Sequence, residues 1–264
     1  MRRAAWLAMA LIVFPVGTLS AQAPPCALAR GDARAIARVI DGESLALDDG
    51  RNLRLSGALA PRAGDVGAAA GTWPPETATR TALATLVEGR SVMLWHDARR
   101  SDRYGQVLAH VMIDGTWLQG TLVERGLARA YGRPGVDACV EALVQLERRA
   151  REERLGLWSN AAYGVRAARR GDWPRAVNSF QIVSATVRRV SRGSGDVYLT
   201  LGAWRGRAYP LAAVVAAKRS DLTGGMAPRN LVGRRVLVRG WIEQRRGPVI
   251  VVDSKGQLEL IESQ

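Results

Sequence analysis

Residues 44–55 read Ser44-Leu45-Ala46-Leu47-Asp48-Asp49-Gly50-Arg51-Asn52-Leu53-Arg54-Leu55. Leucine occupies every second position on both sides of the Asp-Asp-Gly turn, and polar residues fill the other phase after the turn. Because successive side chains of a strand point to opposite faces, this alternation predicts two strands with one apolar face. An Asp-Gly pair between such strands is typical of a tight antiparallel connection. The stretch therefore predicts a β-hairpin.

The residues that follow the hairpin predict three helices and two further strands. We expect a helix from Glu76 to Glu88 with Thr77 as its cap, strands Ser91 to His96 and Val107 to Ile113, a helix from Trp117 to Leu127, and a third helix capped by Asp137. The third helix would carry Cys139, Leu143, Leu146 and Ala150 on one apolar stripe and pair Glu147 with Arg151 on its outside. This order predicts a mainly β fold with packed helices, a β-barrel of the α+β class.

Composition indicates a globular protein with two domains. Of the 264 residues, 47% are apolar and 23% are charged, which excludes a disordered or low-complexity chain. Two domains are expected because one domain has roughly 100–200 residues. Residues 24–158 carry 18 basic and 17 acidic groups, whereas residues 159–264 carry 18 basic and 7 acidic groups. We expect a first domain over 30–160, a linker over 161–175 and a basic second domain over 176–264.

The first 23 residues have the pattern of a signal peptide. Arg2 and Arg3 precede an apolar stretch from Ala4 to Val16, and Ala21-Gln22-Ala23 offers small residues for cleavage. This predicts export to the periplasm or the medium. An uncleaved membrane anchor is the alternative, but the apolar stretch is short against the ~20 residues that span a bilayer. No later segment is apolar enough to span, so no integral membrane segment is expected after cleavage.

The chain has two cysteines, Cys26 and Cys139. In an oxidising compartment they would form a single disulfide that ties the mature N-terminus to the third helix. Two separate thiols are the alternative. With His96 and His110 as the only histidines, the chain has too few ligands for a cluster of His and Cys around a metal. Both histidines are expected to be packing or surface residues.

Short strand patterns separated by turns fill the second domain. We expect strands at 182–190, 197–201, 208–216, 235–242, 249–252 and 258–261. The run Leu231 to Trp241 resembles the strand pattern of OB-fold nucleic-acid-binding domains. The resemblance implies a second small OB-like β-barrel.

The basic residues of this domain suggest a polyanion as ligand. The net charge of the chain is +14, and 36 of its 38 basic residues are arginine. Proteins that bind single-stranded nucleic acid combine a cationic groove with aromatic faces for base stacking. The candidate binding residues here are Arg234, Arg235, Arg239, Trp204 and Trp241. In the alternative interpretation the aromatic residues fill the barrel and the arginines form a solvated rim.

Five fragments of the first half carry a family resemblance. They are Val39-Ile40-Asp41-Gly42-Glu43-Ser44, Arg54-Leu55 with Ala60-Pro61, Ser101-Asp102-Arg103-Tyr104-Gly105, Gly126-Leu127-Ala128 and Leu155-Gly156-Leu157-Trp158. In order and spacing they resemble the thermonuclease, or staphylococcal nuclease-like, family. The resemblance implies a five-stranded OB barrel with three helices, which agrees with the pattern of strands and helices above.

The resemblance also implies which site residues are kept and which are replaced. Family nucleases use carboxylates around a calcium ion, a glutamate beside the phosphate, and two arginines that stabilise the developing charge. Three positions retain the family chemistry: Asp41, Glu43 and Arg54. Four positions depart from it. Leu59 replaces a metal-binding carboxylate, Ala60 replaces a threonine, Arg62 replaces the catalytic glutamate and Gln106 replaces the second arginine. Arg54 and Arg62 would bind phosphate or pair with Asp41 or Glu43.

These replacements predict that the nuclease site is degenerate. The leading hypothesis is an exported, inactive thermonuclease-like protein that binds nucleic acid or another polyanion and needs no cofactor. The second is an active secreted nuclease. Calcium would be expected as a cofactor only under this second hypothesis. The third is an envelope protein that binds protein or glycan partners through both barrels.

Overall fold

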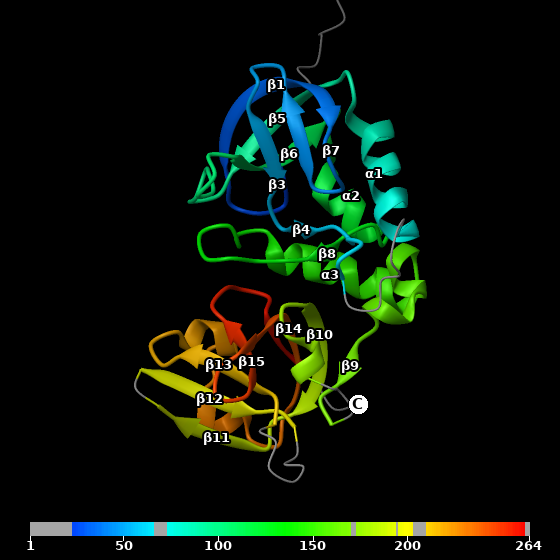
Figure 1. The fold of residues 1–264 in the computed structure, drawn as a ribbon. Coiled ribbons are helices and arrows are strands. Elements are labelled where there is room, and N and C mark those ends of the chain that lie inside the picture. The colour runs from blue at the N-terminus through cyan, green and yellow to red at the C-terminus, as the bar shows by residue number, and fades with distance from the viewer. Residues whose placement is uncertain (1–22, 66–72, 170–172, 194, 203–209, 262–264) are drawn as a thin grey trace, which may run out of the picture.

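The structure, a computed structural model, describes residues 23–65, 73–169, 173–193, 195–202 and 210–261. Its N-terminal part is built around a closed barrel (Figure 1). The barrel strands are β1 (Ala29–Val39), β2 (Ser44–Leu47), β3 (Asn52–Leu55), β5 (Ser91–His96) and β6 (Val107–Ile113). They are neighbours in the order β1-β2-β3-β6-β5 and back to β1, with only the β3–β6 pair parallel. The predicted hairpin is confirmed as β2 and β3, where Leu45 pairs with Leu53.

Helices and short strands cover this barrel. They are β4 (Ala58–Leu59), α1 (Pro74–Val87), β7 (Thr116–Trp117), α2 (Leu118–Glu124), β8 (Arg129–Ala130) and α3 (Val140–Glu152). Leu83 of α1, Leu122 of α2 and Leu143 of α3 are fully buried in the same core as the leucines of the hairpin. The expected mainly β fold with packed helices is confirmed. The expected cap Thr77 is wrong, because α1 begins at Pro74, whose missing N–H and fixed φ suit the first turn.

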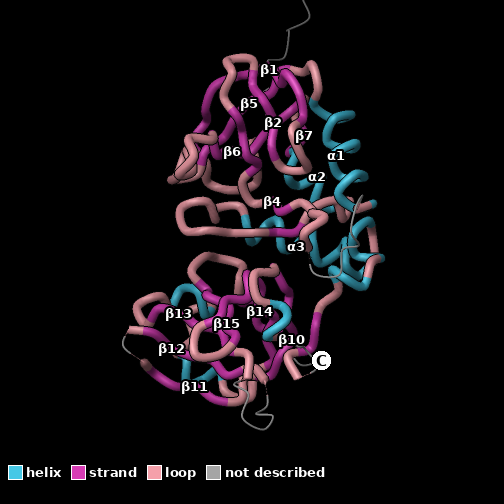
Figure 2. Tube along the Cα trace, viewed as in Figure 1, coloured by secondary structure: helices cyan, strands magenta, loops and turns pink. Residues whose placement is uncertain are grey.

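The C-terminal part is a curled sheet with the same strand order as the barrel. Its strands are β9 (Arg166–Ala167), β10 (Phe180–Thr186), β11 (Arg189–Arg192), β12 (Asp196–Thr200), β13 (Ala212–Ala216), β14 (Arg235–Gln244), β15 (Pro248–Val252) and β16 (Leu258–Ile261). The sheet runs β11-β12-β13-β15-β14-β10-β9, with β16 paired to β14, and β10 and β11 are consecutive in the chain (Figure 2). β13 and β15 are parallel, as β3 and β6 are. The mainly β class expected for this half is therefore present, in the form of a half-barrel sheet.

Short 3-10 turns connect and complete the two parts. They are Gly156–Ser159, Ala161–Tyr163, Pro174–Ala176, Ser220–Thr223 and Pro228–Leu231. Within the segment expected as a linker, β9 pairs in parallel with β10, and the side chain of Trp173 is buried. The segment expected to be a signal peptide, residues 1–23, lies outside the described residues except for Ala23. Among the described residues, no helix has the length and apolar character needed to cross a membrane.

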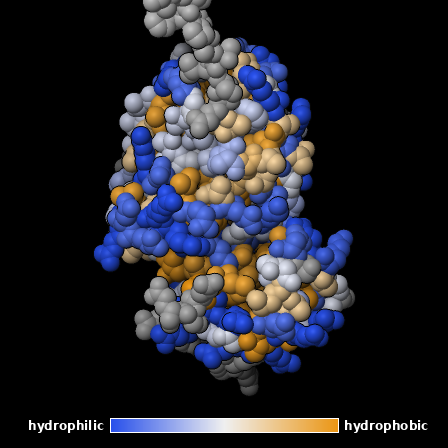
Figure 3. All heavy atoms as spheres, turned by 180° about the vertical axis from the view of Figure 1, so that it is seen from behind, coloured by the Kyte–Doolittle hydropathy of each residue, from blue (hydrophilic) through white to orange (hydrophobic). Residues whose placement is uncertain are grey.

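Apolar side chains join the two parts. One buried cluster combines Leu59, Trp73 and Trp158 of the N-terminal part with Phe180 and Ile182 of β10. The back view in Figure 3 shows apolar residues gathered where the parts meet, with hydrophilic residues above and below. The parts therefore pack through a shared apolar core rather than through solvent-filled contacts.

A buried ion cluster lies at the same junction. Arg239 of β14 contacts Glu147 of α3 at 2.8 Å and Glu259 of β16 at 2.5 Å. Arg239 is 1% exposed and Glu147 is fully buried. Burial lowers the pKa of Arg239, but the charges of Glu147 and Glu259 outweigh it and raise the pKa above its usual value. The expectation that Glu147 faces outward is wrong: it keeps its pair with Arg151, at 3.6 Å, inside the junction.

A disulfide ties the N-terminal end of the described chain to α3. Cys26 and Cys139 are bonded across a sequence separation of 113, with their Cα atoms 5.2 Å apart. Cys139 is the residue that precedes α3 and is fully buried. The expected cap of this helix, Asp137, uses its carboxylate instead to accept the N–H of Lys255 at 3.0 Å.

His110 of β6 is buried as a neutral side chain. It is 1% exposed, and its Nδ1 accepts a hydrogen bond from Trp117 Nε1 at 3.2 Å. Burial lowers the pKa of His110 to about 4, against a smaller opposing effect from the charge of Asp97. His110 is therefore a packing residue of the barrel.

Arg239→Ala should destabilise the protein strongly. The change leaves Glu147 as a buried charge without its main partner, a loss that typically costs ~3–5 kcal/mol. Arg234→Ala is the matched control, because Arg234 is exposed and its replacement should change stability by less than about 0.5 kcal/mol. Chemical denaturation of both variants measures the difference. Equal small losses would show that Arg239 is not a structural residue.

Reduction of the disulfide should also destabilise the protein. A cross-link over a loop of this size restricts the unfolded chain and is worth about 2–5 kcal/mol. Cys26→Ser should lower the melting temperature by about as much as reduction of the wild type does. A reducing agent should then have no further effect on the melting temperature of the variant. A wild-type protein whose melting temperature does not respond to the reducing agent would contradict this.

Stability should fall as the pH drops from about 6.5 toward about 4. In this range unfolded His110 binds a proton that the folded protein excludes, so acid favours unfolding by up to ~1.4 kcal/mol per pH unit. His110→Asn should make the pH dependence of the unfolding free energy shallower. Parallel curves for the wild type and His110→Asn would exclude this role.

Candidate functional site

The residues that the family resemblance singled out come together at one end of the barrel. Ser44, next to Glu43, pairs with Arg54 across β2 and β3. The parallel pairing of β3 with β6 places Leu53 opposite Val107, the neighbour of Gln106. Ala60 and Arg62 follow β4 directly. The strand register therefore gathers four segments of the chain, of which the one at Gln106 is distant in sequence from the others.

Glu43 is the centre of this group, and both oxygens of its carboxylate accept hydrogen bonds. It is 2% exposed. Arg54 and Arg62 both donate to Glu43 Oε1, and the backbone N–H of Ala60 donates to Oε2 at 3.1 Å. Burial lowers the pKa of Arg62, but the charge of Glu43 outweighs it and raises the pKa above its usual value. Two guanidinium groups thus occupy the side of the carboxylate that a metal ion would need.

The remaining positions do not complete a calcium site. Asp41 is exposed and uses Oδ1 to accept the N–H of Glu43 at 2.8 Å, which shapes the turn between β1 and β2. Leu59 is 1% exposed and packs in the apolar core. Within the described ranges, no three side chains of His, Cys, Asp or Glu are placed to hold a metal ion. Calcium prefers six to eight oxygen ligands, so these residues do not fit it.

Gln106 lies in a turn held by Asp102. Asp102 Oδ1 accepts the backbone N–H groups of Tyr104 at 2.8 Å and of Gln106 at 3.0 Å. The side chain of Gln106 is half-buried and carries no charge. It therefore brings an amide to the place where the family pattern has a cation.

A second polar network, which the sequence did not predict, holds the loop after Arg62. Asp65 Oδ2 accepts from Arg129 at 3.0 Å, from the hydroxyl of Tyr163 at 2.9 Å and from the backbone N–H of Arg62 at 3.1 Å. Trp73 Nε1 donates to the hydroxyl of Tyr163 at 2.7 Å. Burial lowers the pKa of Arg129 and raises that of Tyr163. The network fixes the backbone that carries Arg62.

Arg129 links this network to the C-terminal part. Its guanidinium lies 4.9 Å from the ring centre of Tyr163 and 5.2 Å from that of Phe180 in β10. Arginine stacks well on aromatic faces while it pairs with a carboxylate. The only sequence signal for this role is that Arg129 directly follows the motif Gly126-Leu127-Ala128. The motif does not predict which residues Arg129 contacts.

The candidate binding residues of the C-terminal part that the structure describes do not all lie on its surface. Arg234 and Arg235 are exposed. Arg239 is corrected from a ligand-binding to a structural residue, because it is buried between Glu147 and Glu259. Trp241 is half-buried, with its ring 6.0 Å from that of Phe180 and nearly perpendicular to it. Trp204 lies outside the described residues.

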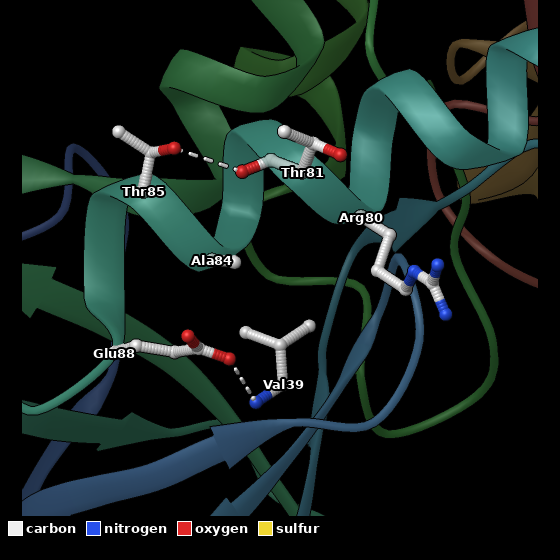
Figure 4. A pocket seen from close by; sticks show the side chains of 6 residues that line it. All are labelled: Val39, Arg80, Thr81, Ala84, Thr85 and Glu88. Carbon is white, nitrogen blue, oxygen red and sulfur yellow. Dashed lines mark hydrogen bonds between the residues drawn. The ribbon is translucent and has the colours of Figure 1, made fainter.

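Two pockets near the barrel are weaker candidates for a functional site than the Glu43 group. A cleft of about 290 Å³ at the junction is lined by Trp241 and Tyr131, together with arginines and with the acids Glu243 and Asp253. A pocket of about 480 Å³ lies between α1 and the end of β1 (Figure 4). There Glu88 already accepts the N–H of Val39 at 3.1 Å, and Thr85 donates to the carbonyl of Thr81. Neither pocket contains the Glu43 group.

Comparison with known proteins supports the resemblance. The family model described as staphylococcal nuclease homologue matches residues 52–160. The chain is 30% identical to a thermonuclease of Staphylococcus hyicus over 129 residues, which cover 47% of this chain and 75% of that protein. It is 29% identical to a thermonuclease of Staphylococcus intermedius over 132 residues, 49% of this chain and 77% of that protein.

A bacillus protein is also similar over a shorter region. The SPbeta prophage-derived endonuclease YokF of Bacillus subtilis (strain 168) is 32% identical over 89 residues, 33% of this chain. The matched region spans only 30% of YokF. The match to the family model ends at residue 160, before the C-terminal sheet begins. By its barrel and by these relatives, the chain belongs to the staphylococcal nuclease homologue family.

Proposed function

We propose that this protein is an exported member of the family whose nuclease site is degenerate, and that it acts by binding nucleic acid or another polyanion. One observation carries the proposal: the carboxylate of Glu43 is closed by Arg54, Arg62 and the N–H of Ala60. Two positive guanidinium groups at Oε1 oppose a cation beside the same oxygen, and Oε2 already accepts an N–H.

The chemistry of the replaced residues supports inactivity. A guanidinium stays protonated in proteins, so Arg62 cannot take a proton from an attacking water molecule. Leu59 offers no oxygen to a cation, and Gln106 offers no positive charge to a phosphate in the transition state. Loss of one such donor typically costs ~10²–10³ in rate, and here the base, the donor and the metal ligand are all replaced.

Charge and family support a polyanionic ligand. The relatives named above are nucleases, whose substrates are nucleic acids, and the present chain has a net charge of +14. Export is part of the proposal. It is supported by the basic and apolar pattern at the start of the sequence and by the disulfide, which is a bond typical of oxidising compartments.

The purified protein should not cleave DNA or RNA in calcium above a chelated control. The measurement is a gel digestion assay, with a thermonuclease of Staphylococcus hyicus as the positive control. Arg54→Ala is the matched variant, because it removes the last catalytic arginine of the family pattern and should change nothing in an inactive protein.

Calcium-dependent cleavage that disappears in Arg54→Ala would overturn the proposal in favour of an active secreted nuclease. A protein that neither cleaves nor binds polyanions at moderate salt would instead support the third hypothesis, an envelope protein with protein or glycan partners.

A further inference from the structure

We infer that a pocket on the C-terminal sheet, lined by Arg169, Arg188 and Arg235, is the site that takes a phosphate group of the nucleic-acid ligand. This inference rests on the proposed function and adds a place and a chemistry to it. The pocket has a volume of about 350 Å³ and is also lined by Ser184, Thr186 and aliphatic residues.

The sheet register explains why these side chains meet. Ser184 and Thr186 are two residues apart in β10, so both point to the same face, while Val183 and Val187 point into the core. Thr186 pairs directly with Arg235 of β14. Arg188 follows two residues after Thr186, and its backbone N–H is fixed on the carbonyl of Thr200 at 2.8 Å.

The other wall of the pocket is built by β9. Ala167 pairs with Ser184, and the N–H of Ala168 donates to the carbonyl of Ser184 at 2.9 Å. These contacts hold the chain around Arg169 beside β10. Two regular strands and one short parallel strand thus position the polar groups, so the pocket belongs to the folded sheet.

The polar groups of the pocket suit an oxyanion. Among the residues that the structure describes, no carboxylate lines it. Across the same ranges, Arg188 and Arg235 are within ion-pair distance of no acidic group, whereas Arg219 and Arg245 of the C-terminal part pair with Asp221 and Asp196. Guanidinium groups bind phosphate oxygens through two parallel hydrogen bonds, and hydroxyl groups donate to the remaining oxygens.

The apolar part of the lining indicates which portion of a strand is held. Among the residues that the structure describes, it contains only aliphatic side chains, whereas sites that hold bases or sugar rings commonly present aromatic faces. A tetrahedral phosphate fits both the donors and the aliphatic character of the described lining. The pocket would therefore hold the backbone of a strand and leave its bases to other parts of the protein.

The test compares two double variants of the full chain that remove the same charge. Arg188→Gln with Arg235→Gln changes the pocket. Arg189→Gln with Arg192→Gln is the control, because both residues are exposed on β11 outside the pocket. Melting curves in chloride establish that both variants are folded, as expected for exposed positions.

Two probes are used, a short labelled single-stranded DNA and inorganic phosphate. The pocket variant should bind the DNA at least about tenfold more weakly than the control, since each hydrogen bond to a charged group is worth about tenfold in affinity. Its log-log salt dependence should be shallower by ~0.7 for each phosphate that the pocket no longer binds. Phosphate should raise the melting temperature of the wild type and of the control at constant ionic strength, but not that of the pocket variant.

If both variants bind DNA equally weakly and phosphate does not shift the melting temperature, the inference that this pocket binds phosphate is wrong. DNA would then be bound by a diffuse basic surface. Binding of heparin through the pocket without binding of DNA would overturn the assignment to a nucleic-acid phosphate. If the wild type binds neither DNA nor heparin, the proposed function fails as well. If it binds DNA but the pocket variant binds equally well, only the pocket inference fails.

Discussion

The buried contact between Arg239 and Glu147 constrains how the two halves of the molecule fit together. Neither charge is exposed to water, so each requires the other. Glu147 also accepts the N–H of Ala130 in β8 at 2.7 Å, and β8 pairs with β4 just before the segment that carries Arg62. Through one carboxylate, the position of the C-terminal sheet is linked to the strand pair beside Glu43.

The same rule, that a buried carboxylate needs a counter-charge, accounts for the Glu43 group. In a metal-dependent site that charge comes from the cation. Here Arg62, which the family resemblance aligns with the family glutamate, supplies a positive group from the chain itself. Under the proposed function, this one residue replaces the base and also neutralises the carboxylate of Glu43. Such a double effect would make a degenerate site compatible with an intact fold.

Sequence periodicity predicted the elements that depend on local alternation. The hairpin, β5, β6 and the three helices were found close to their observed bounds, because one apolar face per element is visible in the order of residues. Glu147 was placed outside because its spacing to Arg151 is typical of an exposed helical pair. Its buried partner Arg239 lies 92 positions away, and Asp65 lies 64 positions from Arg129. Helical or strand periodicity carries no information about partners that come from another part of the fold.

The two halves share a strand order but use arginine differently. In the N-terminal half, 18 basic groups meet 17 acidic groups, and Arg54, Arg62 and Arg129 all end on carboxylates. After residue 158 only 7 acidic groups face 18 basic ones, so most of that charge must be balanced by dissolved anions. A strand that replaces several such ions by its phosphates releases them, which is a favourable contribution to binding at low salt. The polyanion affinity that we propose would therefore depend on arginines that, among the described residues, have no acidic partner, such as Arg188 and Arg235, rather than on the number of arginines.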